Sequence, residues 1–185
     1  MRGAWMDPEG TELATLDRLI SLPGTRVLEI GCGSGRLTWA LAERARSVVA
    51  IDPDQAKRDQ ARLLGADQTA AAGADLEPGA AVAVLDLVGS DATLAEAARL
   101  VRPTGVVMVV GEAGGRLPFG FGAVPDEAHL TTSVWGSYRD LVAVVELARA
   151  GTLRWEVEAL PLHRVNEALE RLRHGRVRGR LVLTP

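Results

Sequence analysis

Apolar segments of strand length alternate with segments of helical periodicity along this chain. The runs AVAVLDL and GVVMVVG are almost continuously apolar, which is typical of central strands covered on both faces by helices. Strands are predicted at 26–30, 47–51, near 68–72, 81–87, 105–111, near 130–135, 154–160 and 179–183. Helices are predicted at 9–22, 34–45, 54–64, 91–101, 138–150 and 162–174. Because this alternation indicates βαβ units, we expect an α/β fold, a three-layer αβα sandwich around a mostly parallel sheet.

Glycine and proline residues mark the limits of these elements. Gly151 and Gly175 each follow a periodic segment directly, where a left-handed residue commonly ends a helix. Residues 112–128 form a long loop rich in Gly, Pro and Phe, and such a loop can act as a lid at the carboxyl ends of the strands. We expect residues 1–185 to form a single domain, with 154–185 as a strand–helix–strand extension.

The composition argues against several classes of partner. The chain has 185 residues, of which 47% are hydrophobic and 24% charged, as in an ordinary soluble domain. Its net charge of −3 argues against a nucleic-acid surface, and no apolar run approaches the roughly 18 residues of a membrane span. The N-terminal sequence MRGAWMDPEGTE has no apolar signal core, and a single cysteine cannot build a disulfide framework. We therefore expect a cytoplasmic protein without nucleic-acid or membrane partners.

A glycine-rich turn follows the first predicted strand. The turn contains Gly31, Gly33 and Gly35. Glycine suits a tight turn because such a turn needs a positive φ or a close approach of the backbone. A helix that begins after such a turn offers unpaired N–H groups to a ligand. Asp52 ends the next strand about twenty residues later, at the usual spacing for a carboxylate that binds ribose hydroxyls. Together these features indicate a site for an adenosine-containing cofactor.

Two further interpretations of this segment stay open. The glycines can serve the turn alone while Asp52 caps the following helix, because Asp52-Pro53 also looks like a helix start. Cys32 lies inside the turn, where the N-terminus of a helix lowers the pKa of a thiol. A small residue that fits the turn is the simpler interpretation of Cys32.

Two positions bear on the identity of the cofactor. A dinucleotide fingerprint has the form G-x-G-x-x-G, but Arg36 stands where its third glycine belongs. Glu29 precedes the first glycine by two residues, where its carboxylate would repel a pyrophosphate and attract the cationic groups of S-adenosylmethionine. The charge pattern therefore favours S-adenosylmethionine.

Residues 8–54, above all VLEIGCGSGRLTWALAERARSVVAIDPD, resemble the first motif of class I S-adenosylmethionine-dependent methyltransferases. The resemblance implies that the E-x-G-x-G-x-G run surrounds the methionine and ribose of the cofactor, and that Asp52 holds the ribose hydroxyls. It also implies an acid after the third strand that reads the adenine amino group, for which AGADLEPG offers Asp75. The candidate cofactor-binding residues of this part are Glu29, Gly31, Cys32, Gly33, Gly35, Asp52 and Asp75.

From about residue 60 the sequence resembles a second family, the medium-chain, zinc-type alcohol dehydrogenases. The resemblance is carried by ARLLGADQT, AVLDLVGSDATLAEAARLVRPTGVVMVVGEAGG, LPFGFGAVPDEAHLTTSVWGSYRDLVAVVELARAGTL and PLHRVNEALERLRHGRVRGRLVLTP. It implies NAD or NADP as the cofactor. It also implies that Val88, Gly89, Val110 and Gly111 lie near a bound nicotinamide ring.

The second resemblance is incomplete. These dehydrogenases carry a catalytic domain before the cofactor domain, and that domain supplies the Cys and His ligands of zinc. One cysteine and three histidines, His129, His163 and His174, predict no zinc site within one subunit. The family also packs its last strand and helix against the catalytic domain. We therefore expect the apolar residues of 154–185 to pack on the sheet edge or to form a homodimer.

Three functions follow from these patterns. The first is an S-adenosylmethionine-dependent methyltransferase-like protein with an unknown acceptor, since methyl transfer depends largely on positioning. The alternative is an NAD- or NADP-binding fragment of an oxidoreductase, and the third is an inactive chimera. Both resemblances imply a Rossmann-like sheet, and the chain looks like a join of two such domains near residues 55–60.

Overall fold

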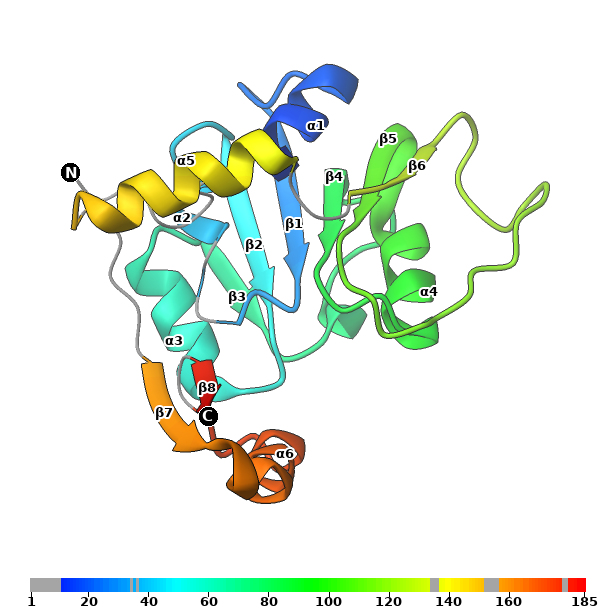
Figure 1. Ribbon diagram of the computed structural model, residues 1–185. Coiled ribbons are helices and arrows are strands. Elements are labelled where there is room, and N and C mark those ends of the chain that lie inside the picture. Colours follow the sequence, from blue (N-terminus) through cyan, green and yellow to red (C-terminus); the bar gives the residue numbers. More distant parts are fainter. Residues whose placement is uncertain (1–10, 34, 36, 134–136, 152–156, 178–179) are drawn as a thin grey trace. The chain divides into compact units, whose positions relative to one another are not determined.

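The structure is a computed structural model, and it divides the chain into two compact units, Met1–Val144 and Val145–Pro185. It describes residues 11–33, 35, 37–133, 137–151, 157–177 and 180–185, without the side chains of residues 11, 12, 75 and 140. Figure 1 shows the elements of both units. The expectation of a single domain stays a prediction.

The first unit is built on a six-stranded sheet. Its strands are β1 (Arg26–Ile30), β2 (Ser47–Ile51), β3 (Gln68–Ala70), β4 (Ala81–Asp86), β5 (Val101–Val109) and β6 (His129–Thr132). All neighbouring strands are parallel, in the order β3-β2-β1-β4-β5-β6 (Figure 1). The strand order reverses between β1 and β4, and ligands of open α/β sheets bind outside the carboxyl ends of the strands at such a point. The predicted parallel sheet is confirmed.

Helices cover both faces of this sheet. They are α1 (Thr11–Leu19), α2 (Thr38–Ala42), α3 (Gln55–Leu63) and α4 (Asp91–Leu100). Leu16 of α1 and Leu41 of α2 pack in one cluster with Val27 of β1. Leu100 of α4 packs in another cluster with Leu28 of β1. Since consecutive residues of β1 point into different clusters, the strand is covered on both faces, and the three-layer αβα sandwich is confirmed.

Helix α2 is much shorter than the predicted helix at 34–45. Gly35 has a φ of +79°, a left-handed conformation that cannot belong to an α-helix, and α2 begins only at Thr38. After Ala42 the chain turns towards β2, where the Arg46 N–H donates to the Thr25 carbonyl oxygen at 2.8 Å. The prediction is therefore wrong at both ends, and residues 34 and 36 of the predicted range lie outside the described part.

The start of β5 also differs from the prediction of a strand at 105–111. The strand begins at Val101, directly after α4. Thr104 has a φ of +61°, and the pairing of β5 with β4 shifts in register between Ala81 and Ala83. The additional residues form an irregular beginning, so the apolar run from Gly105 onward is the regular part of the strand.

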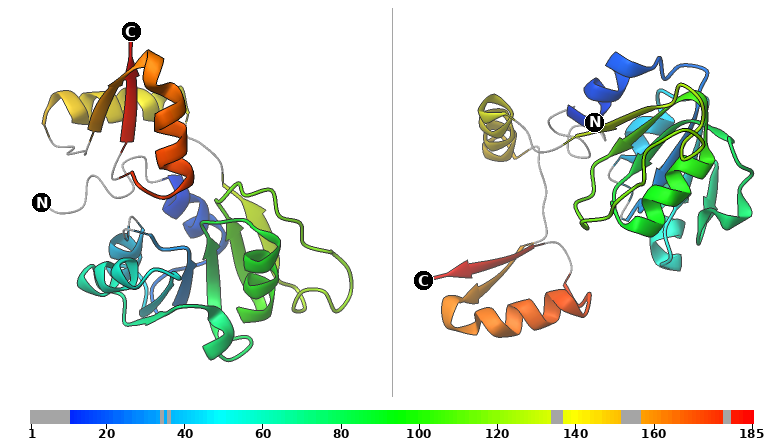
Figure 2. Two further views of the ribbon diagram at one scale, coloured as in Figure 1. Left: turned by 90° about the horizontal axis from the view of Figure 1, so that it is seen from below. Right: turned by 90° about the vertical axis from the view of Figure 1, so that its right-hand side faces the viewer.

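The second unit contains a parallel pair of strands. Helix α5 (Tyr138–Arg149) crosses the division between the units. The pair consists of β7 (Val157–Pro161) and β8 (Arg180–Thr184), connected by η2 (Leu162–Arg164) and α6 (Val165–Arg173), which lies alongside the pair in Figure 2. Positive φ values at Gly151 and Gly175 confirm both predicted helix ends. None of the helices in the described ranges is long and apolar enough to cross a membrane.

Candidate functional site

Three glycines shape the turn after β1. Gly31, Gly33 and Gly35 have φ values of +76°, +53° and +79°, which confirms the predicted positive φ. The N–H groups of Gly31 and Cys32 both donate to the Ile51 carbonyl oxygen, at 2.8 and 3.0 Å. The Gly35 N–H donates to the Cys32 carbonyl oxygen at 2.9 Å. These N–H groups hold the turn itself, and α2 is only a short helix, so the turn offers a phosphate less than the sequence predicts.

Asp52, which follows β2, faces the glycine turn. Its Oδ2 accepts the N–H of Gly33 at 2.9 Å, and its Oδ1 accepts the N–H of Asp54 at 2.9 Å. A carboxylate has about four acceptor positions, so both oxygens keep the capacity to accept a ribose hydroxyl. Asp54 is the residue that caps α3, because its Oδ1 accepts the Ala56 N–H at 2.8 Å. The alternative in which Asp52 caps this helix is therefore wrong.

Glu29 is completely buried on β1. Its Oε2 accepts the hydroxyl of Thr38, the first residue of α2, at 2.5 Å. The side chain therefore joins β1 to α2 inside the protein and presents no exposed charge to a ligand. The predicted repulsion between Glu29 and a pyrophosphate loses its basis, because it required the carboxylate to lie open beside the turn.

Cys32 is also buried, with 2% of its surface exposed, and it packs with Ala50 and Ala61. Burial, together with the nearby charges of Glu29 and Asp52, raises the pKa of the Cys32 thiol to about 12. The thiol is therefore protonated at neutral pH and is not an activated nucleophile. Cys32 serves the turn as a small residue that fits.

The turn after β1 lies directly against the loop after β4. A Cβ atom at Gly31 would lie 2.5 Å from Cγ2 of Val88. Gly89 lies equally close to Gly111, since a Cβ atom at Gly89 would overlap the Gly111 carbonyl oxygen. The structure thus brings Gly31, Val88, Gly89 and Gly111 together at the carboxyl ends of β1, β4 and β5.

Asp86, the last residue of β4, was not predicted from the sequence. It is completely buried, and its Oδ1 accepts the N–H groups of Val88 and Gly89, both at 2.9 Å. Its carbonyl oxygen accepts the N–H groups of Val110 and Gly111, at 2.8 and 3.0 Å. The available signal was an acid at the end of an otherwise apolar run, AVLDLVG. Asp86 is the residue that joins the loops after β4 and β5.

The acid predicted to read adenine lies on another segment. Asp75 belongs to the 3-10 helix η1 (Gly73–Asp75), which follows β3 and is held by Arg99, whose Nη2 donates to the Gly73 carbonyl oxygen at 2.7 Å. The side chain of Asp75 lies outside the described part of the chain. Its contact with a cofactor therefore stays a prediction.

The long loop at 112–128 leaves the carboxyl edge of the sheet. The Thr104 N–H, near the amino end of β5, donates to the Asp126 carbonyl oxygen at 3.0 Å, so the loop returns along the sheet to that end. Phe119 and Phe121 of this loop are strongly exposed. The function of this loop as a lid stays a prediction.

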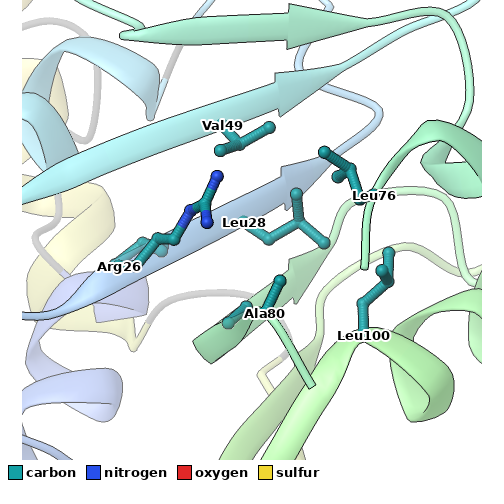
Figure 3. Close-up of a pocket in the computed structure, with 8 residues that line it drawn as sticks. Arg26, Leu28, Val49, Leu76, Ala80 and Leu100 are labelled. Carbon is teal, nitrogen blue, oxygen red and sulfur yellow. The ribbon is translucent and has the colours of Figure 1, made fainter. Parts of the chain in front are cut away.

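A small cavity lies at the opposite, amino end of β1 and β4 (Figure 3). It is lined by Arg26, Val27, Leu28, Val49, Leu76, Ala80, Ala81 and Leu100. Its volume is about 10 Å³, which is about the space of one water molecule. This cavity is too small for a nucleotide.

The structure also tests whether the chain offers ligands to a metal. Among the residues that it describes, no three His, Cys, Asp or Glu side chains lie close enough together to hold an ion. His129 belongs to β6, whereas His163 and His174 belong to the second unit. The described residues therefore do not fit a zinc site, and the expectation of a protein without zinc stays a prediction.

The parallel sheet, the glycine turn and the acid after β2 define a Rossmann-like α/β domain. The family model described as zinc-binding dehydrogenase matches residues 64–183. The D-arabinose 1-dehydrogenase (NADP(+)) of Saccharolobus solfataricus is 33% identical over 149 residues, which are 75% of this chain and 42% of that protein. The chain belongs to the zinc-binding dehydrogenase family.

Solved structures give the same assignment. The alcohol dehydrogenase of Aeropyrum pernix has a TM-score of 0.73 and 30% identity, and the match covers 96% of this chain and 54% of that one. The acetophenone reductase of Geotrichum candidum, solved in complex with NAD, has a TM-score of 0.74 and 26% identity, covering 99% and 54%. The chain thus spans about half the length of the dehydrogenases it matches.

A shorter similarity connects the chain to methyltransferases. The ubiquinone biosynthesis O-methyltransferase of Hahella chejuensis is 46% identical over 50 residues, which are 27% of this chain and 21% of that protein. The predicted resemblance is thus confirmed for a short segment. The dehydrogenase structures match nearly the whole chain, including the region near residues 55–60. The predicted join of two families is therefore supported only in part.

Proposed function

We propose that this chain binds NAD⁺ or NADP⁺ along the carboxyl edge of its first sheet, as the cofactor-binding part of a dehydrogenase. The observation that carries the proposal is the contact of the turn after β1 with the loops after β4 and β5, at the reversal of strand order. Parallel sheets with this strand order bind dinucleotides there. The similarity to a reductase solved in complex with NAD supports the same ligand.

Asp52 is the residue we assign to the adenosine half of the cofactor. Its two oxygens accept backbone N–H groups, which fix the carboxylate beside the glycine turn and leave acceptor positions open. A fixed carboxylate can accept both ribose hydroxyls, but it repels a phosphate on the 2′ oxygen. The proposed cofactor is therefore NAD⁺ in preference to NADP⁺.

The loops after β4 and β5 are assigned to the nicotinamide half. Val88 is partly exposed at the edge, and Gly89 and Gly111 have no side chains that could obstruct a flat ring. These three positions, together with Val110, are those that the dehydrogenase resemblance implies lie near the ring. The cofactor would thus extend from Asp52, after β2, across the carboxyl ends of β1 and β4.

S-adenosylmethionine is the second candidate ligand. The observation in its favour is the 46% identity to a methyltransferase over 50 residues. Asp52 could hold the ribose of this ligand in the same way. The charge argument no longer separates the two candidates, because Glu29 is buried and bonded to Thr38.

Oxidoreductase activity is a wider proposal. It requires side chains that bind and activate a substrate, and those described here bring no metal-binding set together. We therefore propose hydride transfer only for an assembly in which such groups are supplied. The part of the dehydrogenase relatives that this chain does not span is the natural source.

Thermal unfolding and calorimetric titration of the purified chain test the proposed ligand. A ligand at about 100 times its dissociation constant adds about 2.7 kcal/mol to the free energy of unfolding. We expect NAD⁺ to stabilise the chain more than NADP⁺, and S-adenosylhomocysteine to have no effect. Stabilisation by S-adenosylhomocysteine alone would establish the methyltransferase-like candidate instead. No stabilisation by any of the three would contradict both candidates.

A further inference from the structure

Asp86 is the one acid among the described residues of the first sheet's carboxyl edge that is completely buried and yet touches two loops. Its Oδ1 takes both the Val88 and Gly89 N–H groups, while its Oδ2 has no hydrogen-bond partner within the described residues. Burying a carboxylate is costly unless its hydrogen bonds compensate. A neutral residue of similar size would fill the same space at lower cost, so Asp86 indicates a function beyond filling the core.

The hydrogen bonds of Asp86 hold two loops at one point. The side chain fixes the residues after β4, and the carbonyl oxygen takes the N–H groups of Val110 and Gly111 after β5. The loops are also bonded to each other, because the Ala113 N–H donates to the Val88 carbonyl oxygen at 3.1 Å. Asp86 therefore contributes to their separation, and its side chain acts on the loop after β4.

The two loops pack closely against each other. A Cβ atom at Gly111 would overlap the backbone of Val88, and one at Gly89 would overlap Gly111. Gly89 has a φ of +71°, and its N–H and that of Val88 are both held by the Asp86 carboxylate, so we expect the loss of this acceptor to loosen the start of the first loop. The Asp86 carboxylate thus fixes the start of the loop after β4.

Asp52, at the other part of the carboxyl edge, forms hydrogen bonds with different residues. Asp52 binds Gly33 and Asp54, and neither it nor Asp86 shares a hydrogen-bond partner with the other. The β1–β4 pairing, in which Ile30 lies opposite Asp86, separates the two groups. The two carboxylates thus fix different residues of the edge, although Gly31 of the first turn also packs against Val88.

We propose that Asp86 is a positioning residue for the nicotinamide half of a dinucleotide and has no part in holding the adenosine half. This inference rests on the proposed function. Because Asp86 is completely buried behind the backbone of Val88 and Gly89, its own side chain does not contact the ligand. It fixes the position of the loop after β4, against which the nicotinamide half of the ligand lies.

The test compares the binding of NAD⁺ and of AMP, which contains the adenosine half alone. Asp86→Ala removes the acceptor, and we expect it to weaken NAD⁺ about tenfold, or about 1.4 kcal/mol, with AMP affinity unchanged. Asp86→Asn keeps an acceptor oxygen for both N–H groups, so we expect it to bind NAD⁺ within about threefold of the original chain. A purely structural defect would weaken both ligands together.

A second variant covers the case in which Asp86→Ala fails to fold. Gly111→Ala separates the two loops without changing Asp86, and it should likewise weaken NAD⁺ and leave AMP unchanged. Equal losses for NAD⁺ and AMP, or no loss of NAD⁺ affinity in either variant, overturn the inference. If the unaltered chain binds neither NAD⁺ nor AMP, the proposed function itself is wrong.

Discussion

Asp52 and Asp54 are two acids separated by one proline, and their side chains form hydrogen bonds with different parts of the structure. Asp52 bonds to the Gly33 N–H across the turn, whereas Asp54 bonds to Ala56 within its own helix. The sequence Asp-Pro-Asp does not reveal this division, because each acid alone could cap α3. The hydrogen bonds make Asp52 the ligand candidate and Asp54 a structural residue.

The pair provides a matched comparison. We expect Asp52→Ala to weaken NAD⁺ and AMP alike by about tenfold or more, because a hydrogen bond to a charged group contributes about 1.5–3 kcal/mol. Asp54→Ala should lower the free energy of unfolding by about 1 kcal/mol through the lost cap and leave both affinities unchanged. Calorimetry and urea unfolding measure the two effects. The assignment fails if Asp54→Ala weakens the ligands as much as Asp52→Ala does.

Cys32 gives a prediction about reactivity. Burial raises its thiol pKa to about 12, so the thiolate that reacts with iodoacetamide is very rare at pH 8. We expect labelling to be slow in the folded chain and fast in urea, followed by mass spectrometry. Rapid labelling of the folded chain would contradict the buried position.

The same pKa shift links Cys32 to stability. The folded state binds the thiol proton more tightly than the unfolded state, where the pKa is near 9.0. The corresponding stabilisation is complete below pH 9 and is lost as the pH rises from 9 towards 12. Cys32→Ala serves as the control, because its free energy of unfolding lacks this part of the pH dependence.

At the scale of elements, the ends of the central strands were predictable. β1 and β2 have the predicted bounds, 26–30 and 47–51, whereas β5 begins four residues before the predicted 105–111. The length of α2 was not predictable, because it depends on the left-handed conformation of Gly35. The acid and glycines of the first turn were found from their spacing. Asp86 was not predicted, because its burial and the hydrogen bonds of its side chain to Val88 and Gly89 depend on how the chain turns after β4.

The contact between the loops after β4 and β5 leads to a prediction on stability. A Cβ atom at Gly111 would overlap the Val88 backbone, which cannot yield like the end of a flexible side chain. We expect Gly111→Ala to lower the free energy of unfolding by about 1–3 kcal/mol, as is usual for overpacking. Gly120→Ala is the control, because no atom lies within 4 Å of its Cβ position. Urea unfolding of both variants measures the difference, and equal stabilities would disprove the close contact.

At the scale of the whole molecule, the second unit leaves many apolar side chains exposed. Val157, Leu162, Leu169, Leu172 and Val182 are between 43% and 62% exposed. A groove of about 400 Å³ lies between α6 and β8. An exposed apolar face of this kind is an association site. The homodimer through 154–185 therefore stays a prediction with a defined surface.

Light scattering tests this prediction. We expect the original chain to be a dimer and Leu172→Glu to be a monomer, because the substitution adds a charge to the exposed groove. Leu63→Glu is the matched control, since Leu63 is an apolar residue of the first unit with 82% exposure. It should leave the dimer intact. A monomeric original chain contradicts the prediction directly.

The place of β1 and β2 within the sheet has a consequence for the history of such a domain. These strands, which resemble methyltransferases, lie between β3 and β4, which resemble dehydrogenases. A segment in this position must form two parallel ladders at once and must present a glycine to Val88. A segment exchanged by recombination is therefore compatible with this sheet only if it pairs with both β3 and β4 and places a glycine against Val88.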